Sequence, residues 1–135
     1  MAEHERVARY LVNSGLDHLD HERRPQATAA LKQAVDVWPS CAEAWHGLAR
    51  ALDASREAAE ALAAYKRALS LDDTVAEAWH ALGVLQDVAG EVELAAHCFE
   101  AAAELTPGWD VPKKALEVLQ VRYYTLLPHP TASSH

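Results

Sequence analysis

The feature that most constrains this chain is an internal repeat with a period of 34 residues. The pentapeptide Ala-Glu-Ala-Trp-His occurs at residues 42–46 and again at residues 76–80. At this offset, residues 42–75 and 76–109 are identical at 11 of 34 positions. One period earlier, residues 8–41 match more loosely, as terminal repeats often do. Such a repeat predicts an array of small supersecondary units that bury their apolar faces against one another.

The composition predicts that these units are helical. The chain contains 28 alanines and no isoleucine among its 135 residues. Alanine is the best helix former, whereas isoleucine favours strands. Pro39 and Pro107 follow the second half of two repeats, where proline stops a helix because it cannot continue the hydrogen-bond ladder. Each repeat is therefore expected to be a pair of helices.

The repeat resembles the tetratricopeptide repeat, a helix–turn–helix unit of 34 residues. The resemblance rests on a large apolar residue at position 4, leucine at 7, small residues at 8, 20 and 27, and an aromatic residue or leucine at 24. The second repeat has Trp45, Leu48, Ala49, Ala61, Tyr65 and Ala68; the third has Trp79, Leu82, Gly83, Ala95, Phe99 and Ala102; the first has Leu11, Gly15, Ala27, Leu31 and Ala34. Ser14 departs from the pattern, as does Arg56, which stands where a turn glycine is common.

The resemblance implies an all-α, right-handed superhelical solenoid of three repeats with a terminal solvating helix. Small residues let the two helices of a pair approach closely, and Trp45 and Trp79 are expected to fill the gaps beside them. The expected segments are an N-terminal extension (1–7), repeats at 8–41, 42–75 and 76–109, a capping helix (110–127) and a flexible tail (128–135). In the capping helix, Leu116, Leu119, Tyr123 and Leu126 form an apolar row that faces the last repeat.

By the same resemblance, the first helix of each repeat lines a concave groove. The expected groove residues are Arg9, Val12, Asn13, Leu16, Glu43, His46, Arg50, Asp53, Glu77, His80, Val84 and Asp87. This lining is apolar at its N-terminal end and mostly acidic in its middle. It suits a peptide or an amphipathic helix that carries lysine or arginine. The alternative is that these residues are solvated surface positions without a ligand.

One known version of the groove is excluded by the residues. The carboxylate clamp of this family, which grips the C-terminal tails of heat-shock chaperones, uses lysine, asparagine and arginine at five groove positions. Those positions hold Val12, Leu16, Gly47, Glu77 and Ala81 in this chain. Because Glu77 would repel a carboxylate, a clamp of this type is not expected.

The sequence predicts no enzyme, no metal and no cofactor. Glu43-x-x-His46 and Glu77-x-x-His80 supply half of a carboxylate-bridged di-metal site, but the further inward-facing glutamates that such a site needs are missing. The repeat consensus accounts for the duplication. No phosphate-binding glycine loop or nucleophile elbow occurs. His97 and Cys98 point about 100° apart on a helix and do not form a nucleophilic pair.

Charge and cysteine content indicate the partner class and the compartment. The formal net charge is −8, which argues against nucleic-acid binding because phosphates require clustered lysine and arginine. Cys41 and Cys98 fit no disulfide framework and are expected to be reduced and packed. No signal core or membrane-length apolar stretch is present. We expect a cytoplasmic protein, and the abundance of arginine, alanine and glycine suits a bacterial genome rich in G and C.

The predicted function is a non-enzymatic protein–protein interaction module, acting as an adaptor, a scaffold or a chaperone-like protein. One alternative is a homo-oligomeric scaffold that self-associates through Trp38, Val118, Val121, Tyr123 and Tyr124. Another is a chaperone of the type that serves type III secretion translocators, because a small acidic three-repeat protein such as this one resembles those chaperones. Those chaperones carry a longer N-terminal helical segment than the seven residues before the first repeat here, which argues against this alternative.

Overall fold

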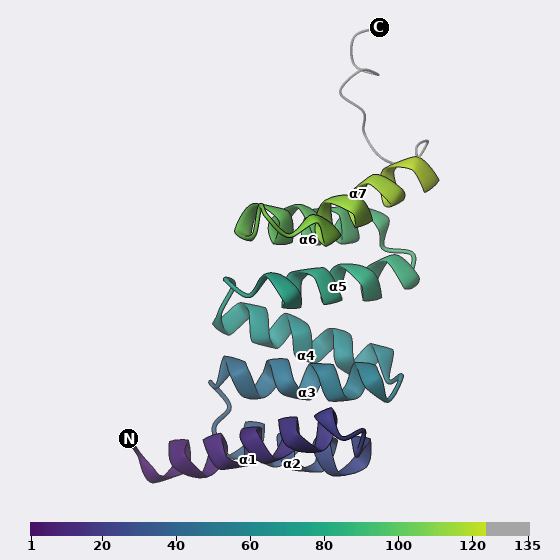
Figure 1. Cartoon of the computed structure of the whole chain (residues 1–135). Helices are drawn as coiled ribbons and strands as arrows, with labels where there is room; N and C mark the ends of the chain where they lie inside the picture. Colours follow the sequence, from purple (N-terminus) through teal and green to yellow (C-terminus); the bar gives the residue numbers. More distant parts are fainter. Residues whose placement is uncertain (124–135) are drawn as a thin grey trace, which may run out of the picture. The chain divides into compact units, whose positions relative to one another are not determined.

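The computed structural model describes residues 1–123, which are all-helical (Figure 1). Seven helices occur in this range: α1 Glu3–Asp20, α2 Arg24–Val37, α3 Ala42–Ala54, α4 Ala58–Leu71, α5 Ala76–Val88, α6 Val92–Leu105 and α7 Asp110–Arg122. The expected tail, 128–135, lies outside the described residues. So do residues 124–127 of the expected capping helix, which include Tyr124 and Leu126.

The chain forms two compact units, which we call unit 1 (Met1–Asp73) and unit 2 (from Thr74 onward). Unit 1 contains α1 to α4. In it α1 packs on α2, α3 packs on α4, and both α1 and α2 contact α3. Unit 2 contains α5 to α7, with α6 packed against both α5 and α7. The helices therefore pair with their neighbours in sequence, as short connections between antiparallel helices require.

The 34-residue period of the sequence is also a period of the backbone. The turn inside each helix pair has one residue with left-handed backbone angles: Glu22 (φ 60°), Arg56 (φ 61°) and Gly90 (φ 84°). The N–H of the following residue donates to the carbonyl five residues earlier. These bonds are Arg23 to His18 (2.8 Å), Glu57 to Leu52 (2.9 Å) and Glu91 to Gln86 (2.8 Å). The bonds close the first helix of each pair in the manner of a Schellman motif.

These turns predict opposite effects for two substitutions. A left-handed conformation costs a non-glycine residue roughly 1 kcal/mol, and glycine adopts it freely. We expect Arg56→Gly to raise the free energy of unfolding by up to about 1 kcal/mol and Gly90→Ala to lower it by about 1 kcal/mol. No atom lies within 4 Å of a Cβ built on Gly90, so the stability lost in Gly90→Ala reports on backbone strain alone. Urea unfolding of both variants tests this, and a neutral Gly90→Ala would contradict it.

The core of unit 1 centres on Leu31 of α2, which is fully buried. Two glycines make room for it. A Cβ on Gly15 of α1 would lie 2.6 Å from Leu31 Cγ, and a Cβ on Gly47 of α3 would lie 2.9 Å from Leu31 Cδ2. Both distances are too short for a real side chain. Gly15, a small residue predicted from the repeat, and Gly47, which the pattern does not predict, therefore let three helices meet around one leucine.

The core of unit 2 joins α6 to α7. Leu119 is fully buried against Phe99, and Leu116 and Tyr123 pack on the same cluster. The apolar row predicted for the capping helix therefore faces α6 as expected, over its described members. On the α5 side, a Cβ built on Gly83 would lie 2.6 Å from Phe99 Cε1.

The structure gives the bounds of the first and last helices, and it differs from one sequence expectation. The first helix begins at Glu3, inside the expected extension, where Glu3 and Glu5 in the first turn stabilise the helix dipole. The last helix is described up to Arg122, with Tyr123 in a turn, and its predicted end at residue 127 lies outside the described residues. Trp45 and Trp79 are only partly buried. The indole N–H of Trp45 donates to the carbonyl of Pro39 at 2.7 Å.

Candidate functional site

The expected groove residues fall in both units. Arg9, Val12, Asn13, Leu16, Glu43, His46, Arg50 and Asp53 belong to unit 1, and Glu77, His80, Val84 and Asp87 belong to unit 2. In unit 1 they lie on α1 and α3, which contact each other. Arg9 Nη1 is 3.8 Å from Glu43 Oε2, and both side chains are more than half exposed. Such an exposed pair contributes little stability, so both groups remain available to a ligand.

Val12 is the exception in unit 1. It is 2% exposed and lies in the core with Ala8 and Gly15, which are buried on the same face of α1. Residues three and four apart share a face of a helix, and this face packs against the neighbouring helices. Val12 therefore does not offer a contact surface. Leu16 is partly buried, and Asn13 is exposed beside it.

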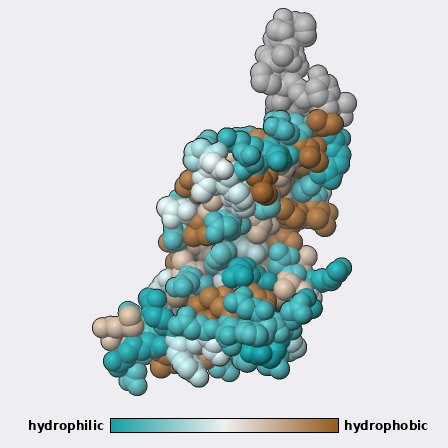
Figure 2. Space-filling view, viewed as in Figure 1, coloured by the Kyte–Doolittle hydropathy of each residue, from teal (hydrophilic) through white to brown (hydrophobic). Residues whose placement is uncertain are grey.

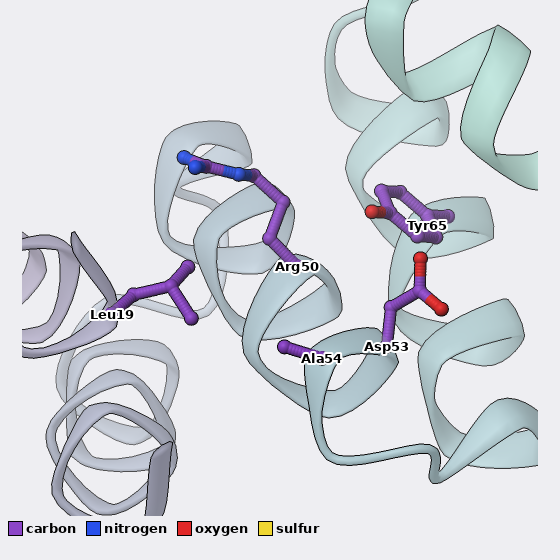
Figure 3. A pocket seen from close by; sticks show the side chains of 5 residues that line it. All are labelled: Leu19, Arg50, Asp53, Ala54 and Tyr65. Carbon is purple, nitrogen blue, oxygen red and sulfur yellow. The ribbon is translucent and has the colours of Figure 1, made fainter. Parts of the chain in front are cut away.

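One concave feature of unit 1 is a hollow of about 430 Å³ that residues of three helices line (Figure 3). Its lining residues are Leu19 from α1, Arg50, Asp53 and Ala54 from α3, and Tyr65 from α4. In Figure 3 the Asp53 carboxylate rises toward the ring of Tyr65, while the guanidinium of Arg50 points away from both. The sequence placed Arg50 and Asp53 on the groove, but it assigned Tyr65 to packing only.

The two acidic groups of this hollow differ in burial: Asp53 is exposed, whereas Tyr65 is buried. Burial raises the pKa of the Asp53 carboxyl. Burial and the nearby Asp53 carboxylate raise the pKa of Tyr65 to about 12, and Arg50 opposes that rise. Tyr65 is therefore a neutral phenol that can donate and accept hydrogen bonds. Among the described side chains of unit 1, none forms an ion pair with Arg50 or Asp53.

In unit 2, His80 is held in an aromatic cluster. Its ring centroid is 5.6 Å from that of Phe99 and 5.4 Å from that of Trp109. Burial lowers the pKa of His80, which favours the neutral imidazole. Glu77, one turn earlier on α5, is exposed. His80 therefore presents a neutral, mainly apolar edge to the surface.

Asp87 joins α5 to α7. Its Oδ2 accepts a hydrogen bond from Arg122 Nη2 at 2.9 Å, and its side chain is 17% exposed. Its Oδ1 is buried and has no hydrogen-bond partner in the described part of the chain. Because Arg122 already occupies this carboxylate, Asp87 is less available to a ligand than Asp53 is.

Exposed valines surround this ion pair: Val84 and Val88 on α5, and Val118 and Val121 on α7. Val88 and Val121 are each 80% exposed. Figure 2 shows apolar surface over the C-terminal part of α5 and over α7. The sequence named Val84, Val118 and Val121, but not Val88.

The residues named for self-association do not form one surface within either unit. Trp38 belongs to unit 1 and is partly buried, with its ring 6.3 Å from that of His4. Val118 and Val121 are exposed in unit 2, while Tyr123 packs on the core there. Arg122 Cζ lies 5.2 Å from the centre of the Tyr123 ring. Tyr124 lies outside the described residues.

Residues 1–123 contain no group of three or more histidine, cysteine, aspartate or glutamate side chains placed to hold a metal ion. Cys41 and Cys98 are free, buried thiols. Cys98 Sγ donates a hydrogen bond to Oε1 of the buried Gln86 at 3.0 Å. None of the helices in this range is both long enough and apolar enough to cross a membrane.

The sequence profile of the tetratricopeptide repeat matches residues 12–76. This part of the chain therefore consists of tetratricopeptide repeats. Among curated proteins, none matches the chain in sequence. The family and the all-helical fold support a protein–protein interaction module. Tetratricopeptide-repeat domains are in general non-enzymatic.

Solved structures share the fold of this chain. The first tetratricopeptide-repeat domain of Spaghetti (RPAP3), bound to the HSP90 peptide SRMEEVD, is 18% identical, with 87% of this chain and 94% of that chain covered and a TM-score of 0.83. MamA is 26% identical, with 87% and 74% covered and a TM-score of 0.75. The Yersinia enterocolitica type III secretion chaperone SycD, in complex with a peptide of the translocator YopD, is 13% identical, with 84% and 92% covered and a TM-score of 0.78. The predicted fold class, an all-α solenoid of tetratricopeptide repeats, is confirmed.

Proposed function

We propose that this protein binds a peptide or an amphipathic helix of another protein on the face formed by α1 and α3. The observation that carries the proposal is the hollow between α1, α3 and α4. Arg50 and Asp53 both line this hollow beside the apolar side chain of Leu19, and neither residue forms an ion pair within unit 1. The protein would act as an adaptor, a scaffold or a chaperone-like module. Arg9, Asn13, Leu16, Glu43 and His46 would extend the contact surface.

A preformed surface explains how such binding gains affinity. Leu31 locks α1 and α3 against α2, so little conformational entropy is lost on the protein's side when a partner docks. Two of the similar solved structures are complexes with peptides, which supports a peptide as the class of partner. The residues at the carboxylate-clamp positions differ, so the partner would not be a C-terminal carboxylate gripped in that way.

Unit 2 offers a second contact surface under the same proposal. Glu77 and Val84 are exposed on α5, and His80 presents a partly buried ring between them. Asp87 would contribute less, because its carboxylate is bonded to Arg122. A partner of this surface would carry apolar residues for Val84 and basic residues for the acidic side chains.

The charge reversal Arg50→Glu tests the proposal. Arg50 is exposed and forms no ion pair within unit 1, so we expect the variant to keep its urea midpoint while partner binding falls at least tenfold. The measurement is affinity capture from lysate with quantitative mass spectrometry, followed by titration of the identified partner. Lys32→Glu, the same charge change at an exposed site on α2, is the matched control. Equal retention of every partner by wild type and both variants would contradict the assignment.

A second candidate function is self-association through α7. Val118 is 56% exposed and Val121 is 80% exposed, on the side of α7 that borders a hollow of about 480 Å³. Exposed apolar side chains at this density favour an interface. Light scattering on a size-exclusion column distinguishes the candidates. A wild-type dimer that Val121→Glu dissociates would support the homo-oligomeric scaffold. A monomeric wild-type protein would contradict self-association and favour the adaptor.

A further inference from the structure

We propose that the hollow between α1, α3 and α4 is a specificity pocket for a single arginine side chain of the partner. The inference rests on the proposed function, because it names the partner group that the same face would recognise. Three observations carry it: the chemistry of the walls, the state of Asp53, and the direction of Arg50.

The walls of the hollow match the parts of an arginine side chain. Leu19 and Ala54 offer carbon surface, against which the three methylene groups of arginine can lie. Asp53 of α3 and Tyr65 of α4 contribute oxygen atoms to the lining; Asp53 is exposed, whereas Tyr65 is 3% exposed. A guanidinium has five N–H donors in a rigid fork, so it can bond both carboxylate oxygens and the phenol together. A lysine ammonium satisfies fewer acceptors and is more strongly hydrated.

The state of Asp53 favours a cation as the partner group. Asp53 is exposed at the hollow, and no lysine, arginine or histidine of unit 1 forms an ion pair with it in the described structure. A partner that covers the hollow would withdraw this charge from water, and a cation with good hydrogen-bond geometry offsets the cost. Tyr65 remains a neutral phenol and adds no second negative charge.

The direction of Arg50 leaves the site open to a cation. Although Arg50 lines the hollow, its guanidinium points away from Asp53 and Tyr65 (Figure 3). It is free to contact an acidic group elsewhere on the partner. A partner segment with an arginine flanked by an acidic residue would satisfy both Asp53 and Arg50.

The test uses N-acetyl-arginine amide as the probe, with amide resonances of the full-length protein followed by NMR. We expect saturable shifts centred on Arg50–Ala54 and Tyr65. N-acetyl-citrulline amide, which has the same shape without the charge, should bind at least tenfold more weakly. Asp53→Asn should weaken the arginine probe at least tenfold, and Tyr65→Phe about threefold. Asp36→Asn, an exposed acid on α2, controls for general attraction to an acidic protein.

The outcomes separate this inference from the proposed function. Equal binding of arginine and citrulline probes, or unchanged binding in Asp53→Asn with an intact urea midpoint, would overturn the pocket. Arg50-dependent shifts with N-acetyl-glutamate amide but none with the arginine probe would also overturn it. If the arginine probe binds as expected but Arg50→Glu leaves every captured partner in place, the pocket stands and the proposed partner surface fails. If Arg50→Glu loses its partners but the arginine probe does not bind, the proposed partner surface stands and the arginine pocket fails.

Discussion

Leu31→Ala is expected to lower the free energy of unfolding by about 2 to 5 kcal/mol, the usual cost of truncating a buried leucine. Leu31 has no exposed surface and fills the space beside Gly15 of α1 and Gly47 of α3. Removing three carbon atoms there leaves a cavity among three helices. Urea unfolding followed by circular dichroism measures the loss. Lys32→Ala, at the exposed neighbouring position, should change the stability by less than about 0.5 kcal/mol.

A double-mutant cycle makes this prediction more specific. Gly15→Ala would place its Cβ 2.6 Å from Leu31 Cγ, so it should destabilise the wild-type protein through overpacking, by about 1 to 3 kcal/mol. In the Leu31→Ala background the clash is gone, and the added methyl group partly fills the cavity. The two losses should therefore fall short of additivity by about 0.5 to 3 kcal/mol. Strictly additive losses would show that the two residues do not share this contact.

Gly83→Ala is expected to lower the free energy of unfolding by about 1 to 3 kcal/mol, because α5 and α6 lie too close for a methyl group. The new Cβ would lie 2.6 Å from Phe99 Cε1 and 3.2 Å from Cys98 Cβ. Phe99 is 2% exposed and packed in the core of unit 2, so its ring has little room to move. The readout is the shift of the urea midpoint at constant m-value.

The matched control for Gly83 is Gly108→Ala. A Cβ on Gly108 meets no atom within 4 Å, so the change should stay within about 0.5 kcal/mol. Phe99→Leu, combined with Gly83→Ala, should recover part of the loss because the smaller side chain relieves the overlap. A Gly83→Ala protein as stable as wild type would mean that the helices separate without cost, and that the small residue is not required by packing.

Much of the fold was predictable because the repeat determines it locally. Alanine-rich helices, small residues at every close approach and prolines after the second helices all agree with one another. Such agreement between local preference and global pattern is typical of a sequence that specifies one fold. The left-handed turn residues were less visible, since Glu22 and Arg56 carry no glycine signal. Their alignment with Gly90 at the 34-residue offset was the signal that would have revealed them.

The candidate site was predictable only in part. The repeat register placed Arg50 and Asp53 on one helix face, and the structure brings both to the hollow in unit 1. The same register also selected Val12, which is buried. It missed Tyr65 as a wall of the hollow, because that residue satisfies the packing position of the repeat as well. Periodicity reports the direction in which a side chain leaves its helix, and it does not report how far a neighbouring helix covers that direction.

By itself, the sequence determined the family, the helix pairing and the residues that allow close packing. These properties depend on local backbone preferences and on a spacing that recurs three times. Only the tertiary structure decided which charged groups are already paired: Asp87 is bonded to Arg122 from a helix 35 residues later, whereas Asp53 keeps no such partner in unit 1. The two aspartates occupy equivalent repeat positions. Their difference arises from contacts between distant segments, and the free energy of burying a charge depends on those contacts.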